Sequence, residues 1–134
     1  MINKLVKYFL LIIHLLLISC IFYYSWLPNP SFKTEIYLPN SLIHWTEEHG
    51  IIRTGVPFVL LSINAVILNI KKISPIKIFL MLFLLLLLAE VGQLFLKYRH
   101  FDLMDIFAGT VAIIMGLGIG LGLQKVFKPK VGEI

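Results

Sequence analysis

Charged residues are scarce in this chain of 134 residues: they make up 14% of it, whereas a soluble domain has about 25%. A single cysteine excludes an internal disulfide and says nothing about the redox compartment. Also missing are a glycine-rich phosphate loop, a serine nucleophile with a credible base, a catalytic cysteine arrangement and a convincing metal motif. The usual signatures of soluble enzymes are therefore absent, and we expect no cofactor and no metal.

Hydrophobic residues dominate what is present, at 59% of the sequence. They form four long apolar runs, at about 5–27, 51–70, 76–97 and 102–124. Each run is long enough to cross a hydrocarbon core of about 30 Å as a helix. Too few positions remain for an attached soluble catalytic domain, a nucleotide-binding fold or a water-filled barrel. The sequence therefore predicts an all-α membrane protein, a single domain over residues 1–134 with four transmembrane helices.

The basic residues, which give the chain a net charge of +5, are divided unequally between the two ends of these runs. Eight of the twelve flank one side of the predicted bundle: Lys4, Lys7, Lys71, Lys72, Lys77, Lys125, Lys128 and Lys130. Because cationic residues gather on cytoplasmic flanks, we predict that both termini are cytoplasmic. The basic stretches carry few aromatic residues, so we expect the membrane, and no nucleic acid, as the partner of this charge.

The first apolar run also has a second interpretation, as a cleaved signal peptide. Lys4 and Lys7 precede it, and residues 17–20 resemble a lipoprotein cleavage box that ends at Cys20. The run nevertheless continues through Tyr24, where a mature lipoprotein normally has a polar tether. We therefore predict that the first helix is retained.

The longest loop, residues 28–50, mixes tryptophan, leucine, histidine and glutamate. A short helix is predicted there, with Asn40 or Ser41 as its cap and Gly50 at its end. Such a mixture is typical of a segment that lies on the membrane surface. We predict a short outer interfacial segment between the first two spanning helices.

Glu90 is an anomaly, because it lies inside the third apolar run. A carboxylate in hydrocarbon costs at least about 2.5 kcal/mol on insertion scales. It must therefore face a partner, face a polar cavity or take up a proton. Gln93 and Lys97 follow at i+3 and i+7, so helical spacing places all three residues on one face.

The fourth run carries acidic residues at its start and small residues along one face. The members of this narrow helical arc are Asp102, Asp105, Gly109, Ala112, Gly116 and Gly120. Small residues let helices approach closely in a membrane, so we expect this face to pack inward or to form a homo-oligomer. For Asp102 the competing interpretation is a purely structural role, as the cap of this helix.

The short loop between the third and fourth runs makes these two helices antiparallel neighbours. Five polar residues are therefore expected to converge near the outer membrane face: Glu90, Gln93, Arg99, Asp102 and Asp105. We expect Arg99 to pair with a carboxylate or with a bound anion. His49 and Arg53, just before and within the second run, are outer-loop candidates for the same site.

The pattern Glu90-x-x-Gln93, followed by Arg99-x-x-Asp102-x-x-Asp105, resembles the signature of the VanZ-like family of small bacterial membrane proteins. The resemblance covers about residues 90–116, and the length and four-helix layout are also similar. It implies a multi-pass protein of the bacterial cytoplasmic (inner) membrane, within the cell envelope. The named member of the family gives low-level antibiotic resistance to the glycopeptide teicoplanin. The sequence departs from the family at Gly109 and Ala112, where the family commonly has Asn and Gly.

The resemblance and the polar cluster together lead to a functional hypothesis. An outward-facing polar site binds a lipid-linked or glycan component of the envelope, and whether it also processes that component is left open. Glu90 and Asp105 are the candidate catalytic residues, and Gln93, Arg99 and Asp102 are the candidate substrate-binding residues. Two alternatives stay open: a small proton-coupled transporter or flippase, and a non-catalytic membrane scaffold.

Overall fold

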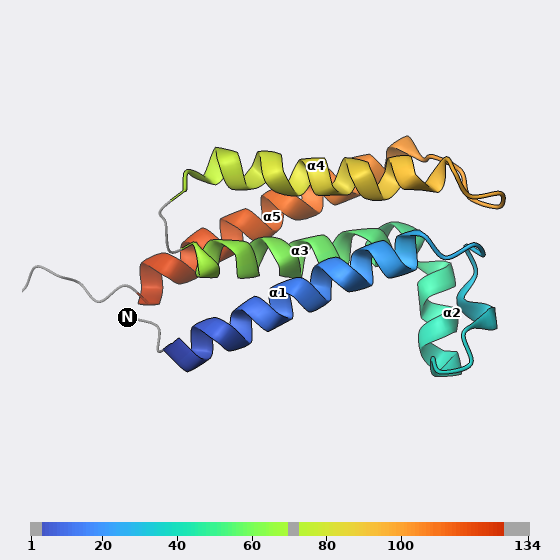
Figure 1. Ribbon diagram of the computed structural model, residues 1–134, viewed down its shortest axis with the longest axis horizontal. Coiled ribbons are helices and arrows are strands. Elements are labelled where there is room, and N and C mark those ends of the chain that lie inside the picture. Colours follow the sequence, from blue (N-terminus) through green and yellow to red (C-terminus); the bar gives the residue numbers. More distant parts are fainter. Residues whose placement is uncertain (1–3, 70–72, 128–134) are drawn as a thin grey trace, which may run out of the picture.

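The structure of the protein, a computed structural model, is described for residues 4–69 and 73–127 (Figure 1). Within these residues every regular element is helical. Four long apolar helices run along the molecule: α1 (Lys4–Ser25), α3 (Gly50–Leu68), α4 (Pro75–Gln93) and α5 (Leu103–Phe127). Each has the length and hydropathy to span a membrane. The predicted all-helical fold with four candidate spanning helices is confirmed, as expected for a multi-pass membrane protein.

Proline marks several of the helix boundaries that the sequence predicts. α1 ends at Ser25, three residues before Pro28. α4 begins with Pro75, a position where the missing N–H would have no helical partner. These ends lie within a few residues of the predicted ones, because proline interrupts the helical hydrogen-bond ladder.

The end of α4 differs most from the prediction. The apolar run predicts a helix to residue 97, whereas α4 ends at Gln93. The next three backbone N–H groups bond to carbonyls three residues back, and such tight turns do not continue an α-helix. The prediction that Lys97 shares a face with Glu90 and Gln93 is therefore wrong. The Lys97 ammonium instead lies 5.5 Å from the centre of the Tyr98 ring.

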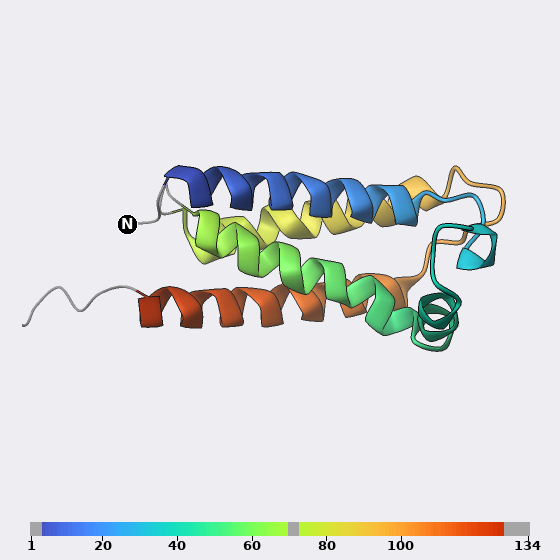
Figure 2. The ribbon, with the colours of Figure 1, turned by 90° about the horizontal axis from the view of Figure 1, so that it is seen from below.

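The loop between the first two spanning helices contains a 3₁₀ turn, η1 (Phe32–Thr34), and a short helix, α2 (Asn40–Glu48). α2 runs across the end of the bundle rather than along it (Figures 1 and 2). An orientation of this kind suits a helix that lies in the plane of a membrane surface. The predicted short helix is present, and its position at the interface stays a prediction.

The two ends of α2 differ from the predicted ones. Pro39 is the N-cap residue, and no side chain caps the helix, whereas the sequence predicts Asn40 or Ser41 in this role. Gly50 does not end α2 but begins α3. The bend between the two helices is made by His49 alone, which lies outside the helical region of backbone space at φ −120° and ψ 49°.

α3 and α5 form the most extensive helix pair, and glycine makes their close approach feasible. A Cβ on Gly116 would lie 2.5 Å from the Val59 carbonyl oxygen, and one on Gly120 would lie 2.9 Å from Val66 Cβ. The small face of α5 therefore packs inward against α3. This is one of the two outcomes predicted for it, the other being a homo-oligomer. Because α3 covers this face within a single chain, a homo-oligomer through it would have to displace α3, and it stays a prediction.

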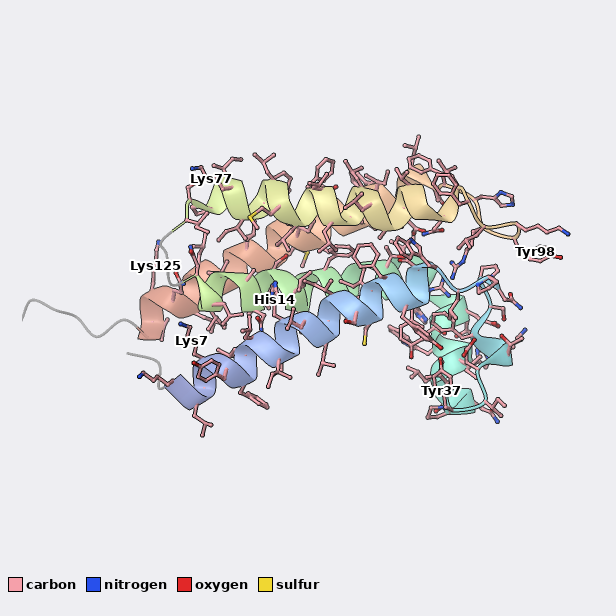
Figure 3. The ribbon with its side chains drawn as sticks, in the orientation of Figure 1. Lys7, His14, Tyr37, Lys77, Tyr98 and Lys125 are labelled. Atoms are coloured by element: carbon pink, nitrogen blue, oxygen red, sulfur yellow. The ribbon has the colours of Figure 1, made fainter. Side chains whose placement is uncertain are left out.

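α1 is the most peripheral of the long helices, while α3 lies between α1 and α5 (Figure 2). Polar contacts hold α1 in place. His14 Nδ1 lies 3.2 Å from Asn64 Oδ1 of α3, and Figure 3 shows this histidine between the two helices. The Trp26 indole N–H donates a hydrogen bond of 3.1 Å to the Ala89 carbonyl of α4. These bonds fix the rotation of a helix that buries little apolar surface in the single chain.

The two ends of the bundle differ in their side chains. Lys7, Lys77 and Lys125 lie at one end, and Tyr37 and Tyr98 lie at the other (Figure 3). We call them the lysine end and the site end. Four residues of the predicted basic side lie outside the described residues: Lys71, Lys72, Lys128 and Lys130.

Candidate functional site

A cavity of about 250 Å³ lies at the site end, between α1, α3, α4 and the start of α5. Its charged and amide lining comprises Arg53, Glu90, Gln93, Arg99 and Asp105. Four of the five residues in the predicted polar cluster thus line one cavity, together with one of the two outer-loop candidates. The remaining wall is largely apolar and comes from α1, from α3 and from Phe32 of η1.

Glu90 lies on the face of α4 that points into the bundle, and only 2% of its surface is exposed. Its Oε1 accepts a hydrogen bond of 3.1 Å from Gln93 Nε2, as their i, i+3 spacing allows. Its Oε2 is buried and has no hydrogen-bond partner among the residues that the structure describes. A buried carboxyl oxygen without a partner is costly, so this atom is the place where a bound group would be stabilised most.

Asp105 supplies the second carboxyl group of the cavity, from the first turn of α5. Thr54 Oγ1, on α3, donates a hydrogen bond of 3.1 Å to Asp105 Oδ1. A negative group in the first turn of a helix is favoured by the helix dipole. The start of α5 is thereby tied to α3, and a second acceptor is presented to the cavity.

Arg99 lies in the turn after α4, but within the described residues it does not pair with a carboxylate, which is one of the two predicted alternatives. Its Nε donates to the Leu27 carbonyl at 3.0 Å, and its Nη2 donates to the Tyr24 carbonyl at 2.9 Å. The Tyr24 carbonyl lies in the last turn of α1 and the Leu27 carbonyl lies just after it, at the end of a helix where a cation is favoured by the helix dipole. Burial, and then the charge of Arg53, lower the pKa of Arg99 from its ordinary value. The remaining guanidinium N–H groups are free to bind an anion.

Arg53 completes the charged lining from the second turn of α3. Its guanidinium lies 4.9 Å from the centre of the Phe32 ring, within the range of a cation–π contact. Phe32 belongs to η1, which α2 holds through Glu47: this carboxylate pairs with Lys33 at 3.2 Å and accepts a bond from Ser31. The bonds from Ser31 and Lys33 lower the pKa of Glu47. The surface loop thus covers the site end and orients Arg53.

Two predicted site residues do not line the cavity. Asp102 caps α5: its Oδ1 accepts a hydrogen bond of 2.8 Å from the Met104 N–H, and the residue is exposed. His49 stacks on Trp45, with ring centres 5.1 Å apart. The structural interpretation of Asp102 is therefore the better one. His49 instead forms the bend between α2 and α3.

Sequence reasoning missed Thr54 and the apolar half of the cavity. A single threonine in an apolar run carries no sequence signal for a functional role. Its position next to the candidate residue Arg53 is the one feature that could have pointed to it. The apolar lining residues Leu17, Cys20, Val56 and Leu60 look like ordinary membrane-facing residues in the sequence. These residues come together only because α1 packs against α3, and no local sequence pattern predicts this packing.

Within the part of the chain that the structure describes, no group of three or more His, Cys, Asp or Glu side chains is arranged to hold a metal ion. No family model, curated protein or solved structure matches this chain. The site must therefore be interpreted from its own geometry.

Proposed function

We propose that this chain is a VanZ-like integral membrane protein of the bacterial cell envelope, and that its cavity binds the polar head of a lipid-linked or glycan envelope component. One observation carries the proposal: Glu90, whose buried Oε2 has no hydrogen-bond partner among the described residues, lines a cavity together with two arginines. A hydroxyl or ammonium group would satisfy this oxygen, and a phosphate would bind the arginines. Through the family resemblance, we also propose a link to teicoplanin-type resistance.

Each lining residue has a role in this proposal. Arg99 and Arg53 bind the anionic group, and Gln93 orients a hydroxyl or amide while it holds Glu90. Glu90 and Asp105 accept hydrogen bonds from the ligand, and any acid or base step is assigned to them. We assign Asp102 no role in binding, because it caps α5 and does not line the cavity.

Arg99→Ala is expected to weaken the binding of a polyprenyl-phosphoryl hexose about tenfold or more, because a charge-assisted hydrogen bond is lost. Binding is measured by native mass spectrometry or calorimetry on protein in nanodiscs. Lys97→Ala is the matched control, since this cation lies in the same turn but contacts Tyr98. Arg99 also bonds to α1, so thermal unfolding is recorded to show that the variant is folded. Equal affinities for both variants would contradict the proposal.

Orientation is part of the proposal: the lysine end faces the cytoplasm and the site end faces outward. The motivation is the eight-to-four division of basic residues. In a Cys20→Ser background, a membrane-impermeant maleimide added from outside should label His100→Cys and leave Lys77→Cys unlabelled. Both positions are exposed in the structure. Labelling of position 77 alone would show that the protein has the opposite orientation and would contradict this part of the proposal.

The buried carboxyl of Glu90 also favours a second candidate, a proton-coupled transporter or flippase, because intramembrane carboxyls commonly relay protons. In vesicles containing the purified protein, this candidate requires transfer of lipid across the bilayer that depends on a pH gradient. Transfer must disappear in Glu90→Gln. Binding without gradient-dependent transfer would favour the binding protein over the carrier.

A further inference from the structure

Most of the cavity lining on α1 and α3 belongs to one stripe of residues on each helix, and each stripe is apolar except for one residue at the site end, Tyr24 on α1 and Arg53 on α3. On α1 the stripe is Leu17, Cys20, Ile21 and Tyr24, and on α3 it is Arg53, Val56, Pro57 and Leu60. Both follow i, i+3, i+4, i+7 spacing, which places each set on one side of its helix. The cavity is therefore continuous with the groove between α1 and α3.

This groove reaches below the end of the bundle. Cys20 lies five residues before the end of α1 and Leu60 ten residues after the start of α3, so their depths are about 8 and 15 Å at 1.5 Å per residue. In a spanning bundle these depths belong to the hydrocarbon core. The lower part of the cavity therefore lies where lipid chains are the surrounding solvent.

The groove is also open sideways. Val56 and Leu60 line the cavity, yet they are 44% and 50% exposed, and Cys20 is exposed as well. Residues that both line a cavity and reach the outer surface of two spanning helices form an opening toward the bilayer. Water in this lower part would contact apolar walls on both sides, which is unfavourable.

The polar upper part demands a different kind of group. The Oε2 of Glu90 lacks a hydrogen-bond partner among the described residues, and the charged lining consists of two carboxyls and two guanidinium groups. A head that combines an anionic group with hydroxyl or ammonium donors matches this lining. Polar and apolar parts of the cavity thus match the head and the chain of one amphiphile.

We infer that the cavity is loaded from the bilayer through the groove between α1 and α3, and that its occupant is a membrane amphiphile whose chain lies in this groove while its head reaches Glu90. The inference rests on the proposed function and narrows it. Of the lipid-linked and soluble glycan components considered above, it selects the lipid-linked one.

Two groove-filling variants test this inference, each with a matched control on a lipid-facing surface outside the cavity. Leu60→Trp is paired with Leu80→Trp on α4, whose leucine is 56% exposed, and Cys20→Phe is paired with Leu16→Phe on α1. The binding probe is a polyprenyl-phosphoryl hexose in nanodiscs, and the soluble probe is hexose 1-phosphate. Partition into the bilayer affects the lipid probe equally in every variant, so differences between paired variants report on the groove.

Both groove-filling variants are expected to weaken binding of the lipid probe about tenfold, as a steric clash does, while the controls stay within about twofold of the parent chain. Binding of hexose 1-phosphate should be unchanged in the two controls, and in the two groove-filling variants it should weaken less than binding of the lipid probe. If the lipid probe binds equally to all four variants, loading through the groove is overturned and the proposed function stands. If the unmodified protein binds neither probe, both the loading through the groove and the proposed function are overturned.

Discussion

Gly116→Leu is expected to destabilise the protein by about 3 kcal/mol or more, at the upper end of the cost of overpacking. A Cβ at this position would lie 2.5 Å from the Val59 carbonyl oxygen and 2.6 Å from Ser62 Cβ. Neither the α3 backbone nor a Cβ attached to it can rotate away, so the two helices must separate. Thermal unfolding in detergent, followed by circular dichroism, measures the loss.

Gly118→Leu is the matched control, because nothing lies within 4 Å of a Cβ built on Gly118. It should leave the unfolding temperature unchanged or raise it slightly, since leucine favours a helix more than glycine does. Equal destabilisation by the two substitutions would contradict the packing of α5 on α3. If the chain is instead a scaffold that pairs through this face, Gly116→Leu would abolish the oligomer and leave the monomer folded.

The long helices could be predicted from sequence because their signal is local. A run of about 20 apolar residues has few alternatives in a membrane, and Pro28 and Pro75 mark two of the boundaries. The end of α4 could not be predicted, because Leu94 and Leu96 continue the apolar run into a segment that turns. Only tertiary contacts, such as those of Arg99 with the end of α1, distinguish the turn from another helical turn.

Glu90→Gln is expected to change binding and stability in opposite directions. Affinity for the polyprenyl-phosphoryl hexose should fall about 10- to 100-fold, the range for a hydrogen bond to a charged group. The unliganded protein should gain about 1 kcal/mol or more, because a buried acidic group without a full set of partners is replaced by a neutral amide. Both effects follow from one atom, the Oε2 that has no partner.

Binding isotherms and thermal unfolding curves of the parent and the variant check this prediction. Glu48→Gln is the control, since Glu48 is exposed on α2, outside the cavity, and pairs with His44 at 3.4 Å. It should affect neither affinity nor the unfolding temperature beyond experimental scatter. A Glu90→Gln protein that binds as tightly as the parent would remove Glu90 from the site.

The candidate site could be predicted in part, for reasons that differ between residues. Glu90 and Gln93 stood out because polar residues are expensive in an apolar run, and the short loop after α4 implied that Asp105 lies nearby. The partners of Arg99 could not be predicted, because the carbonyls of Tyr24 and Leu27 carry no sequence signal. Asp102 follows the ordinary chemistry of a helix cap, which sequence alone cannot separate from ligand binding.

Infrared difference spectroscopy tests most directly the claim that Glu90 receives the ligand. Addition of polyprenyl-phosphoryl hexose to the protein in nanodiscs should shift one carboxyl band, because a new hydrogen bond forms at Oε2. The shifted band should be missing from the difference spectrum of Glu90→Gln recorded at saturating ligand. Saturating ligand that leaves every carboxyl band unchanged, or that gives the same difference spectrum in both proteins, would contradict the claim.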